Sequence, residues 1–378
     1  MDAAIQGPRG VSGSPVMVPV PLPELFRLAA QQEAAGRLEE ADRLLNHILA
    51  AAPQQPDALH MAGIVAFRLG RYQEALEKVE AAIQRGVHIA LYLRNICEIY
   101  RALNRLDEAL VAAQRAAALA PNDPLCLHNL AVVRYERVEI DESIAAATRA
   151  LMLKPDLAGA HFARAEALLL KGELAAGWEE YEWRFRIADA KGQLPKTDRP
   201  QWNGTLYNDA RLLLIADQGF GDVIQFSRYI PWVRTRCPDI AVACSPEIVP
   251  VLRQIVPEDR LFTRWESVPP YRSYIPLSGL PRLHGTRLDN VPVQEPYLHA
   301  DPARVAAWRE RLTRLAPGSL KRVGIVWAGR PTHNNDRRRS AKLSDFLRSP
   351  HYRGSRWSRC RRARLPTRPA AISVVRHW

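Results

Sequence analysis

A short glycine-containing loop holds the first residues that could do chemistry. Gly219 and Gly221 follow an apolar run at residues 211–216, and Asp222 closes the loop where apolar residues begin to recur at helical spacing. A glycine loop that enters a helix lets backbone N–H groups approach an anion. Asp222 either accepts a proton from a substrate hydroxyl or caps the new helix, and one carboxylate can do both.

The same loop excludes two familiar nucleotide-binding motifs. A dinucleotide fingerprint requires a third glycine near Gln225 and an acidic residue after the next strand, where Cys244 and Ser245 stand. The sequence also has no GxxxxGK[ST] segment. We therefore predict neither a nicotinamide enzyme nor a P-loop NTPase.

A second polar loop, at residues 327–340, follows the apolar run 323–326 and contains four arginines. Guanidinium groups bind phosphate oxygens in pairs and stay charged, so the loop suits a diphosphate; the alternative is a solvated basic loop. His333 and Asp336 have no further ligand at suitable spacing, so we predict no metal site.

Alternating strands and helices must position these loops. Short apolar runs at residues 211–216, 240–244 and 273–277 are typical of buried parallel strands, and helical segments lie between them and at 301–315. Pro231 is expected to kink the helix after the first loop. We predict an α/β domain at residues 206–315 and the start of a second one at 316–347.

A repeat of 34 residues organises the chain before residue 188. Two sets of small residues keep this period through five copies, and prolines end three of the copies, with Val87 as an exception. This is the tetratricopeptide period, so we predict an α-solenoid of five helix pairs at residues 22–187. The aromatic residues at 178–185 are expected to cap the array against the next domain. The two sets are Ala41, Ala75, Ala109, Ser143 and Gly177, and Ala29, Gly63, Cys97, Ala131 and Ala165; the prolines are Pro53, Pro121 and Pro155.

The totals indicate a cytoplasmic protein without a membrane span. No stretch reaches the roughly 18 apolar residues of a transmembrane helix, and the five cysteines show no close pairing or CxxC spacing. Residues 1–21 lack the features of a signal peptide and are expected to be a disordered lead, and residues 188–205 a linker. The formal charge falls from +13 to +4 without the nine arginines after residue 347, so the basicity does not predict a nucleic-acid partner.

Several segments together resemble a known family. They are the 34-residue repeats, GWEEYEWR at 177–184, PQWNG at 200–204, QGFGD at 218–222, QFSRY at 225–229 and residues 323–340. In order and spacing they resemble bacterial tetratricopeptide-repeat glycosyltransferases, whose catalytic half is similar to the lipopolysaccharide heptosyltransferases and more distantly to the O-linked N-acetylglucosamine transferases. The likeness covers residues 22–347.

The resemblance implies an α + α/β chain in which the solenoid precedes two Rossmann-like domains of a GT-B fold. It implies a nucleotide-sugar donor as co-substrate, no cofactor or metal, and a protein or glycan acceptor. Asp222 matches the proposed base of the heptosyltransferases, and Arg339 with Ser340 beside it matches the donor-phosphate site, to which Gly219 and Gly221 add backbone N–H groups. Asp217 departs from the glutamate expected in the related repeat proteins.

The second Rossmann-like domain is cut short. A complete one needs roughly 100 residues, whereas the Arg-rich segment 348–378 shows no apolar period. Codons for residues 354–365, read two bases along, can encode Val-Ala-Leu-Val-Ser-Leu-Gln-Lys-Gly-Pro-Ala, which resembles a buried strand and loop. We favour a frameshift over a functional basic tail, and sequencing of the coding DNA decides between them.

A non-catalytic interpretation stays open beside the enzyme. The solenoid alone can hold a protein partner on its concave face. Asn95 and Asn129 lie 34 residues apart and match the asparagines that bind extended peptides in O-linked N-acetylglucosamine transferases; ordinary surface polarity is the alternative.

Overall fold

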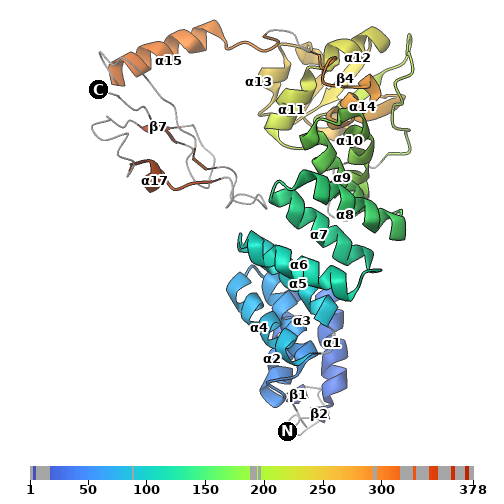
Figure 1. The fold of residues 1–378 in the computed structure, drawn as a ribbon. Coiled ribbons are helices and arrows are strands. Elements are labelled where there is room, and N and C mark those ends of the chain that lie inside the picture. Colours follow the sequence, from blue (N-terminus) through green and yellow to red (C-terminus); the bar gives the residue numbers. More distant parts are fainter. Residues whose placement is uncertain are drawn as a thin grey trace, which may run out of the picture. The chain divides into compact units, whose positions relative to one another are not determined.

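The computed structural model describes residues 3–5, 18–86, 89–187, 194, 197–292, 296–315, 327–328, 340–347, 359–361 and 371–373. The chain divides into two compact units, Met1–Glu295 and Pro296–Trp378 (Figure 1). Each unit is described by itself. Arg339 and most of the predicted second Rossmann-like domain lie outside the described residues.

Helices α1 to α10 form five consecutive pairs in the first unit, as the 34-residue period predicts. Within the predicted lead, β1 (Ala3–Ile5) pairs antiparallel with β2 (Val18–Val20). The helices are α1 (Leu22–Ala34), α2 (Leu38–Ala51), α3 (Pro56–Arg68), α4 (Tyr72–Arg85), α5 (Ile89–Ala102), α6 (Leu106–Leu119), α7 (Pro124–Glu136), α8 (Ile140–Leu153), α9 (Ala158–Lys171) and α10 (Leu174–Tyr181).

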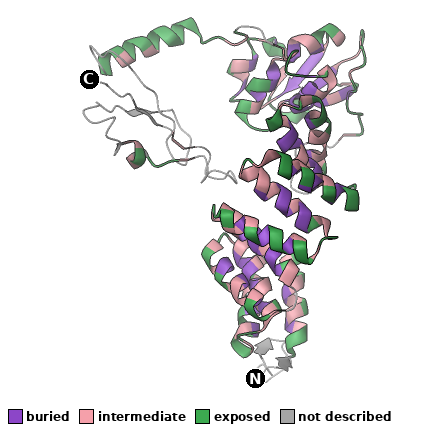
Figure 2. Cartoon of the chain, in the orientation of Figure 1, coloured by how far each residue is buried: buried purple, intermediate pink, exposed green. Residues whose placement is uncertain are grey.

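Small residues allow the two helices of each pair to approach closely. Ala41 and Ala75 are fully buried, and the Ser143 hydroxyl donates a 2.8 Å hydrogen bond to the Ala131 carbonyl of the preceding helix. A Cβ on Gly63 would overlap a methyl group of Val79. The apolar core therefore runs along the array between the helices, as the buried residues in Figure 2 show.

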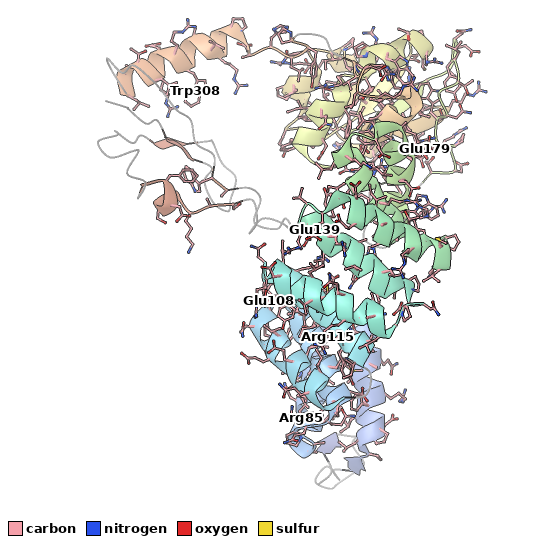
Figure 3. All side chains as sticks on the ribbon, in the orientation of Figure 1. Arg85, Glu108, Arg115, Glu139, Glu179 and Trp308 are labelled. Carbon is pink, nitrogen blue, oxygen red and sulfur yellow. The ribbon has the colours of Figure 1, made fainter. Side chains whose placement is uncertain are left out.

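The array curves so that the first helix of each pair faces inward. The first helices of successive pairs pack on one another, α3 on α5, α5 on α7 and α7 on α9. Between the second helices α4 and α6, by contrast, a cavity of about 490 Å³ opens over α5. Glu108 and Arg115 of α6 line this cavity (Figure 3). The inner face is thus built from α3, α5, α7 and α9.

A four-stranded parallel sheet follows the array in the same unit. Its strand order is β5-β4-β3-β6, so the chain extends the sheet in one direction from β3 and then returns to pair β6 on the other side of β3. Each of the three predicted strands is present, and β5 is an addition. The strands are β3 (Leu212–Ile215), β4 (Ile240–Ala243), β5 (Leu261–Phe262) and β6 (Ser273–Pro276).

Short helices cover this sheet. The helix after the glycine loop breaks before Pro231 into α11 (Phe220–Ser227) and α12 (Ile230–Arg236), which confirms the predicted interruption. A short helix, α13 (Val249–Leu252), lies between β4 and β5, and α14 (Leu280–His284) follows β6. Their apolar side chains pack with buried Trp202 against β3, β4 and β6.

Among its described residues, the second unit contains α15, α17 and one strand pair. Every side chain of α15 is at least partly exposed, and its Arg311 guanidinium lies 4.9 Å from the centre of the Trp308 ring (Figure 3). Strands β7 and β8 pair antiparallel within the Arg-rich segment. The elements are α15 (Pro302–Leu315), α17 (Leu343–Leu347), β7 (Arg359–Arg361) and β8 (Ala371–Ser373).

Replacement of Gly63 by alanine tests the close helix approach. Alanine favours a helix over glycine by about 1 kcal/mol, but here the new Cβ would overlap Val79 and lie 3.1 Å from the Ala75 carbonyl oxygen. We expect Gly63→Ala to lower the free energy of unfolding by about 1–3 kcal/mol, measured by urea denaturation. In a Val79→Ala background the cost should shrink. A rise in stability from Gly63→Ala alone would contradict the packing.

Candidate functional site

A buried carboxylate lies at the carboxyl ends of β3 and β6. Asp217 follows β3, and Ser278 follows β6. The Asp217 carboxylate accepts a 3.1 Å hydrogen bond from the Ser278 backbone N–H and another from the Ser278 hydroxyl. Burial raises the pKa of Asp217, although these hydrogen bonds act in the opposite direction. The pair fastens the ends of two strands that are 61 residues apart in the chain.

A buried arginine from the array completes this cluster. Arg184 lies in η1 (Glu182–Arg186), directly after α10, and is 4% exposed. Its guanidinium donates to the Tyr181 carbonyl at 2.8 Å and to the Ser278 hydroxyl oxygen at 2.6 Å, and it lies 4.0 Å from the Asp217 carboxylate. The last turn of the array is therefore anchored at the carboxyl edge of the sheet.

Aromatic residues of the cap surround the anchored arginine. The guanidinium stacks over Tyr181 and Phe185, with its central carbon 4.4 Å and 3.8 Å from the two ring centres. Trp178 packs edge-on against Phe226 of α11, with ring centres 5.8 Å apart. These contacts confirm that the aromatic end of the fifth repeat seals the array against the α/β domain.

The glycine loop lies beside this junction. Gln218 adopts a left-handed backbone conformation with φ of 68°, and its side-chain N–H donates to the Tyr181 hydroxyl at 3.1 Å. The Gly219 N–H donates a 3.0 Å hydrogen bond to the carboxylate of Asp222, the third residue of α11, which caps the start of this helix. Asp222 therefore caps the helix and is also partly exposed. The structure is compatible with both interpretations of this residue, as a helix cap and as a proton acceptor.

The predicted site residues are only partly brought together. Gly219, Gly221 and Asp222 share one loop at the start of α11. Ser340 belongs to the second unit, and Arg339 lies outside the described residues, so their proposed phosphate contacts stay a prediction.

Sequence reasoning missed the partners that hold the loop in place. They are Tyr181, Arg184, Gln218 and Ser278, which join segments far apart in the chain. The polar residues inside the aromatic cap, at 177–185, were the available signal. An arginine among aromatic residues at a domain boundary is a candidate for a buried anchor.

Both predicted asparagines lie on first helices and bridge neighbouring repeats. Asn95 of α5 contacts His60 Nε2 of α3 at 2.8 Å, and Asn129 of α7 donates to the Arg94 carbonyl at 3.1 Å. Asn129 is also buried. The amide nitrogen of each is thus engaged within the array, and a role in partner binding stays a prediction.

A cluster of charged residues spans α5, α7 and α9 on the inner face. The Arg101 guanidinium pairs with Glu98 at 2.5 Å and with Glu136 at 2.6 Å. Glu166 of α9, among the residues that the structure describes, has no hydrogen-bond or ion-pair partner. Burial, and next the repulsion from Glu136, raise the pKa of Glu166 to about 7.

A histidine in the same region is also unsatisfied. The Nδ1 atom of His128, on α7, is closed to solvent and has no hydrogen-bond partner among the described residues. The ring lies against Gly159 at the start of α9, where a Cβ would come within 3.1 Å of it. Burial, with a smaller contribution from Arg101, lowers the pKa of His128 to about 4, so the ring is neutral near pH 7.

Comparisons with known proteins support the repeat array. Residues 26–87 and 60–124 match the tetratricopeptide-repeat family model, so this region consists of tetratricopeptide repeats. Protein FlbA of Caulobacter vibrioides is 32% identical over 197 residues, which cover 46% of this chain and 32% of that protein. The chain therefore spans about a third of the length of this curated relative.

Solved structures match over a similar part of the chain. A thermophilic tetratricopeptide-repeat protein of Thermus thermophilus is 26% identical, with a TM-score of 0.40, over 45% of this chain and 92% of that one. MamA of Desulfovibrio magneticus is 18% identical, with a TM-score of 0.38, over 45% of this chain and 95% of that one. Within the described part of the chain, no helix is both long and apolar enough to span a membrane.

Glu166→Gln should stabilise the array at pH 8. The carboxyl ordinarily has a pKa of 4.5, whereas the folded array raises it to about 7. The folded state therefore holds the proton more tightly, and ionisation costs stability as the pH rises through this window, on the order of 2 kcal/mol. At pH 4 the group is neutral in the folded state and largely neutral in the unfolded state, so the variant should match the wild type. Urea denaturation at both pH values measures this.

The matched control is Glu142→Gln, which removes an exposed carboxylate of α8. It should change stability little at either pH. A Glu166→Gln variant that is less stable than wild type at pH 8 would show that the carboxylate has a stabilising partner.

Proposed function

We propose that this chain belongs to a nucleotide-sugar-dependent glycosyltransferase, in which the array binds a protein acceptor or partner and the parallel sheet forms the acceptor-side domain. The order of motifs along residues 22–347 supports this proposal, because it resembles the tetratricopeptide-repeat glycosyltransferases. The tetratricopeptide repeats are the part that a family match supports.

One observation carries the catalytic part of the proposal. The strand order β5-β4-β3-β6 places β3 at the point where the chain changes direction in the sheet. Open parallel sheets of Rossmann-like folds bind ligands at the carboxyl ends of the strands at this point. The loop of Gly219 and Asp222 stands there, held through Gln218 and Asp217 to the end of the array.

The proposed reaction is a direct displacement at the anomeric carbon. Asp222 removes the proton from the acceptor hydroxyl as its oxygen forms a bond to that carbon, and the bond to the diphosphate breaks. The nucleoside diphosphate leaves with the bonding electron pair. The Gly221 N–H, with Arg339 and Ser340, is proposed to bind its phosphates, and the Gly219 N–H joins them once its hydrogen bond to the Asp222 carboxylate is released.

A non-catalytic scaffold is the second candidate. The array has two features of a binding surface that do not involve the glycine loop. They are Glu166 on its inner face, which has no hydrogen-bond or ion-pair partner within the described ranges, and the cavity between α4 and α6. Curved helical repeats present such surfaces to partner proteins. In this interpretation the α/β domain contributes stability to the last repeat rather than chemistry.

Calorimetry with a panel of nucleotide sugars separates the two candidates. We expect one donor to bind this chain or a version in which the reading frame after residue 353 is restored. Binding by the restored version alone would show that the donor site requires the complete second domain. Binding by neither version would contradict sugar transfer and favour the scaffold.

Asp222→Asn tests the proposed base in whichever version binds a donor. Asparagine keeps an oxygen that accepts the Gly219 N–H, so the helix cap survives while the proton acceptor is lost. We expect transfer of the labelled sugar to fall by about 10²- to 10⁴-fold with little change in donor affinity. Asp209→Asn, at an exposed position, is the control. Equal rates of sugar transfer in Asp222→Asn and Asp209→Asn would show that Asp222 is not the base.

A further inference from the structure

One cluster on the inner face of the third to fifth repeats contains more carboxylates than guanidinium groups. Three carboxylates, Glu98, Glu136 and Glu166, share one guanidinium, that of Arg101. The nearby Arg94 is paired with Asp123 at 3.1 Å and does not compensate the excess. Because Arg101 pairs with Glu98 and Glu136, Glu166 has no ion-pair partner of its own among the described residues, although the Arg101 charge still acts on it.

The surroundings of Glu166 show which side it faces. Two charged groups act on the pKa of Glu166, namely Glu136 of α7 and Arg101 of α5, and both belong to first helices. Besides burial, the Glu166 charge in turn raises the pKa of Tyr135 on α7. The charges on its other sides are paired. Glu180 of α10 pairs with Arg164 at 2.5 Å. The remaining pairs are Asp141 of α8 with Lys171, and Arg184 of η1 with Glu182. Glu166 therefore lies on the inner face formed by α5, α7 and α9.

A second unsatisfied group lies on the same face. His128 rests on Gly159, which precedes Glu166 by seven residues and so occupies the same side of α9. The Nδ1 atom of His128 is buried without a partner among the described residues. An unpaired buried polar atom costs about 1–3 kcal/mol. Within the described part of the chain, the free array thus holds one carboxylate without a hydrogen-bond or ion-pair partner and one buried imidazole nitrogen, His128 Nδ1, without a hydrogen-bond partner.

We infer that this face binds one basic side chain, an arginine or lysine of an extended protein segment, with Glu166 as its carboxylate partner. The inference rests on the proposed protein-binding role of the array and names the chemistry of the segment. A basic side chain supplies the missing cation and several N–H donors. Its contact with the Glu166 carboxylate is a charge-assisted hydrogen bond. An acidic segment would add to the three carboxylates and is excluded by repulsion.

The charge state of Glu166 gives the interaction a pH dependence. Because the free carboxyl titrates near pH 7, it is mostly ionised at pH 8 and mostly protonated at pH 6. His128 stays neutral over this range. Binding of a basic segment should therefore strengthen between pH 6 and pH 8, and the Glu166→Gln variant should lack this strengthening.

Fluorescence anisotropy of labelled dodecapeptides on the full chain tests this inference. The probes are an alternating Gly-Arg peptide and the same peptide with glutamine in place of each arginine. At pH 8 we expect the wild type to bind the arginine peptide about tenfold more tightly than Glu166→Gln does. Glu142→Gln, which removes an exposed charge from α8, should bind as the wild type does. At pH 6 the wild type and Glu166→Gln should differ less in their affinity for the arginine peptide.

Two results would overturn the inference. In one, Glu166→Gln and Glu142→Gln bind the arginine peptide equally at pH 8; in the other, the glutamine peptide binds as tightly as the arginine peptide. Binding of the same chain to an array of immobilised peptides of diverse sequence distinguishes a failure of this inference from a failure of the proposed protein-binding role. If non-basic peptides bind, only the inference about Glu166 fails, and if no peptide binds, the protein-binding role of the array fails with it.

Discussion

The buried contact of Arg184 with Asp217 and Ser278 joins the helical array to the parallel sheet. Removing a charged side chain from water is costly, and the cost is offset here by hydrogen bonds from the two terminal nitrogens of the guanidinium, by the ion pair with Glu182 and by the aromatic rings around it. The Arg184 Nε atom has no hydrogen-bond partner among the described residues. Asp217 is stable in this place only because Ser278 and Arg184 surround it. The end of the array and the edge of the sheet therefore depend on each other. This mutual dependence also fixes the loop that carries Asp222.

Much of this fold could be predicted because its signals are periodic or local. The 34-residue recurrence of small residues such as Ala75 identifies the helix pairs, since the same close contact repeats in every copy. Apolar runs identify three of the four strands of the parallel sheet, and Pro231 marks the break between α11 and α12. The two-residue strand β5 carries too short a pattern to be recognised.

The site was less predictable because it depends on contacts between distant segments. The capping role of Asp222 is local and could be foreseen, whereas Arg184 and Ser278 lie 94 residues apart and meet only in the folded chain. The environment of Glu166 likewise arises from Glu136 and Arg101 on two other helices. Asn129 fits the predicted position, but its amide bonds the neighbouring repeat. Spacing alone does not show which polar groups the fold itself satisfies.

Calorimetric unfolding of Arg184→Met tests the dependence of the array and the sheet on each other. If the buried arginine couples them, residues 22–292 should unfold in one transition in the wild type. The variant should lose about 3–5 kcal/mol and separate into two transitions, because Asp217 is left without its cation. Asp217→Asn in the same background should recover part of the loss. A variant that keeps a single transition at the wild-type temperature would contradict the account.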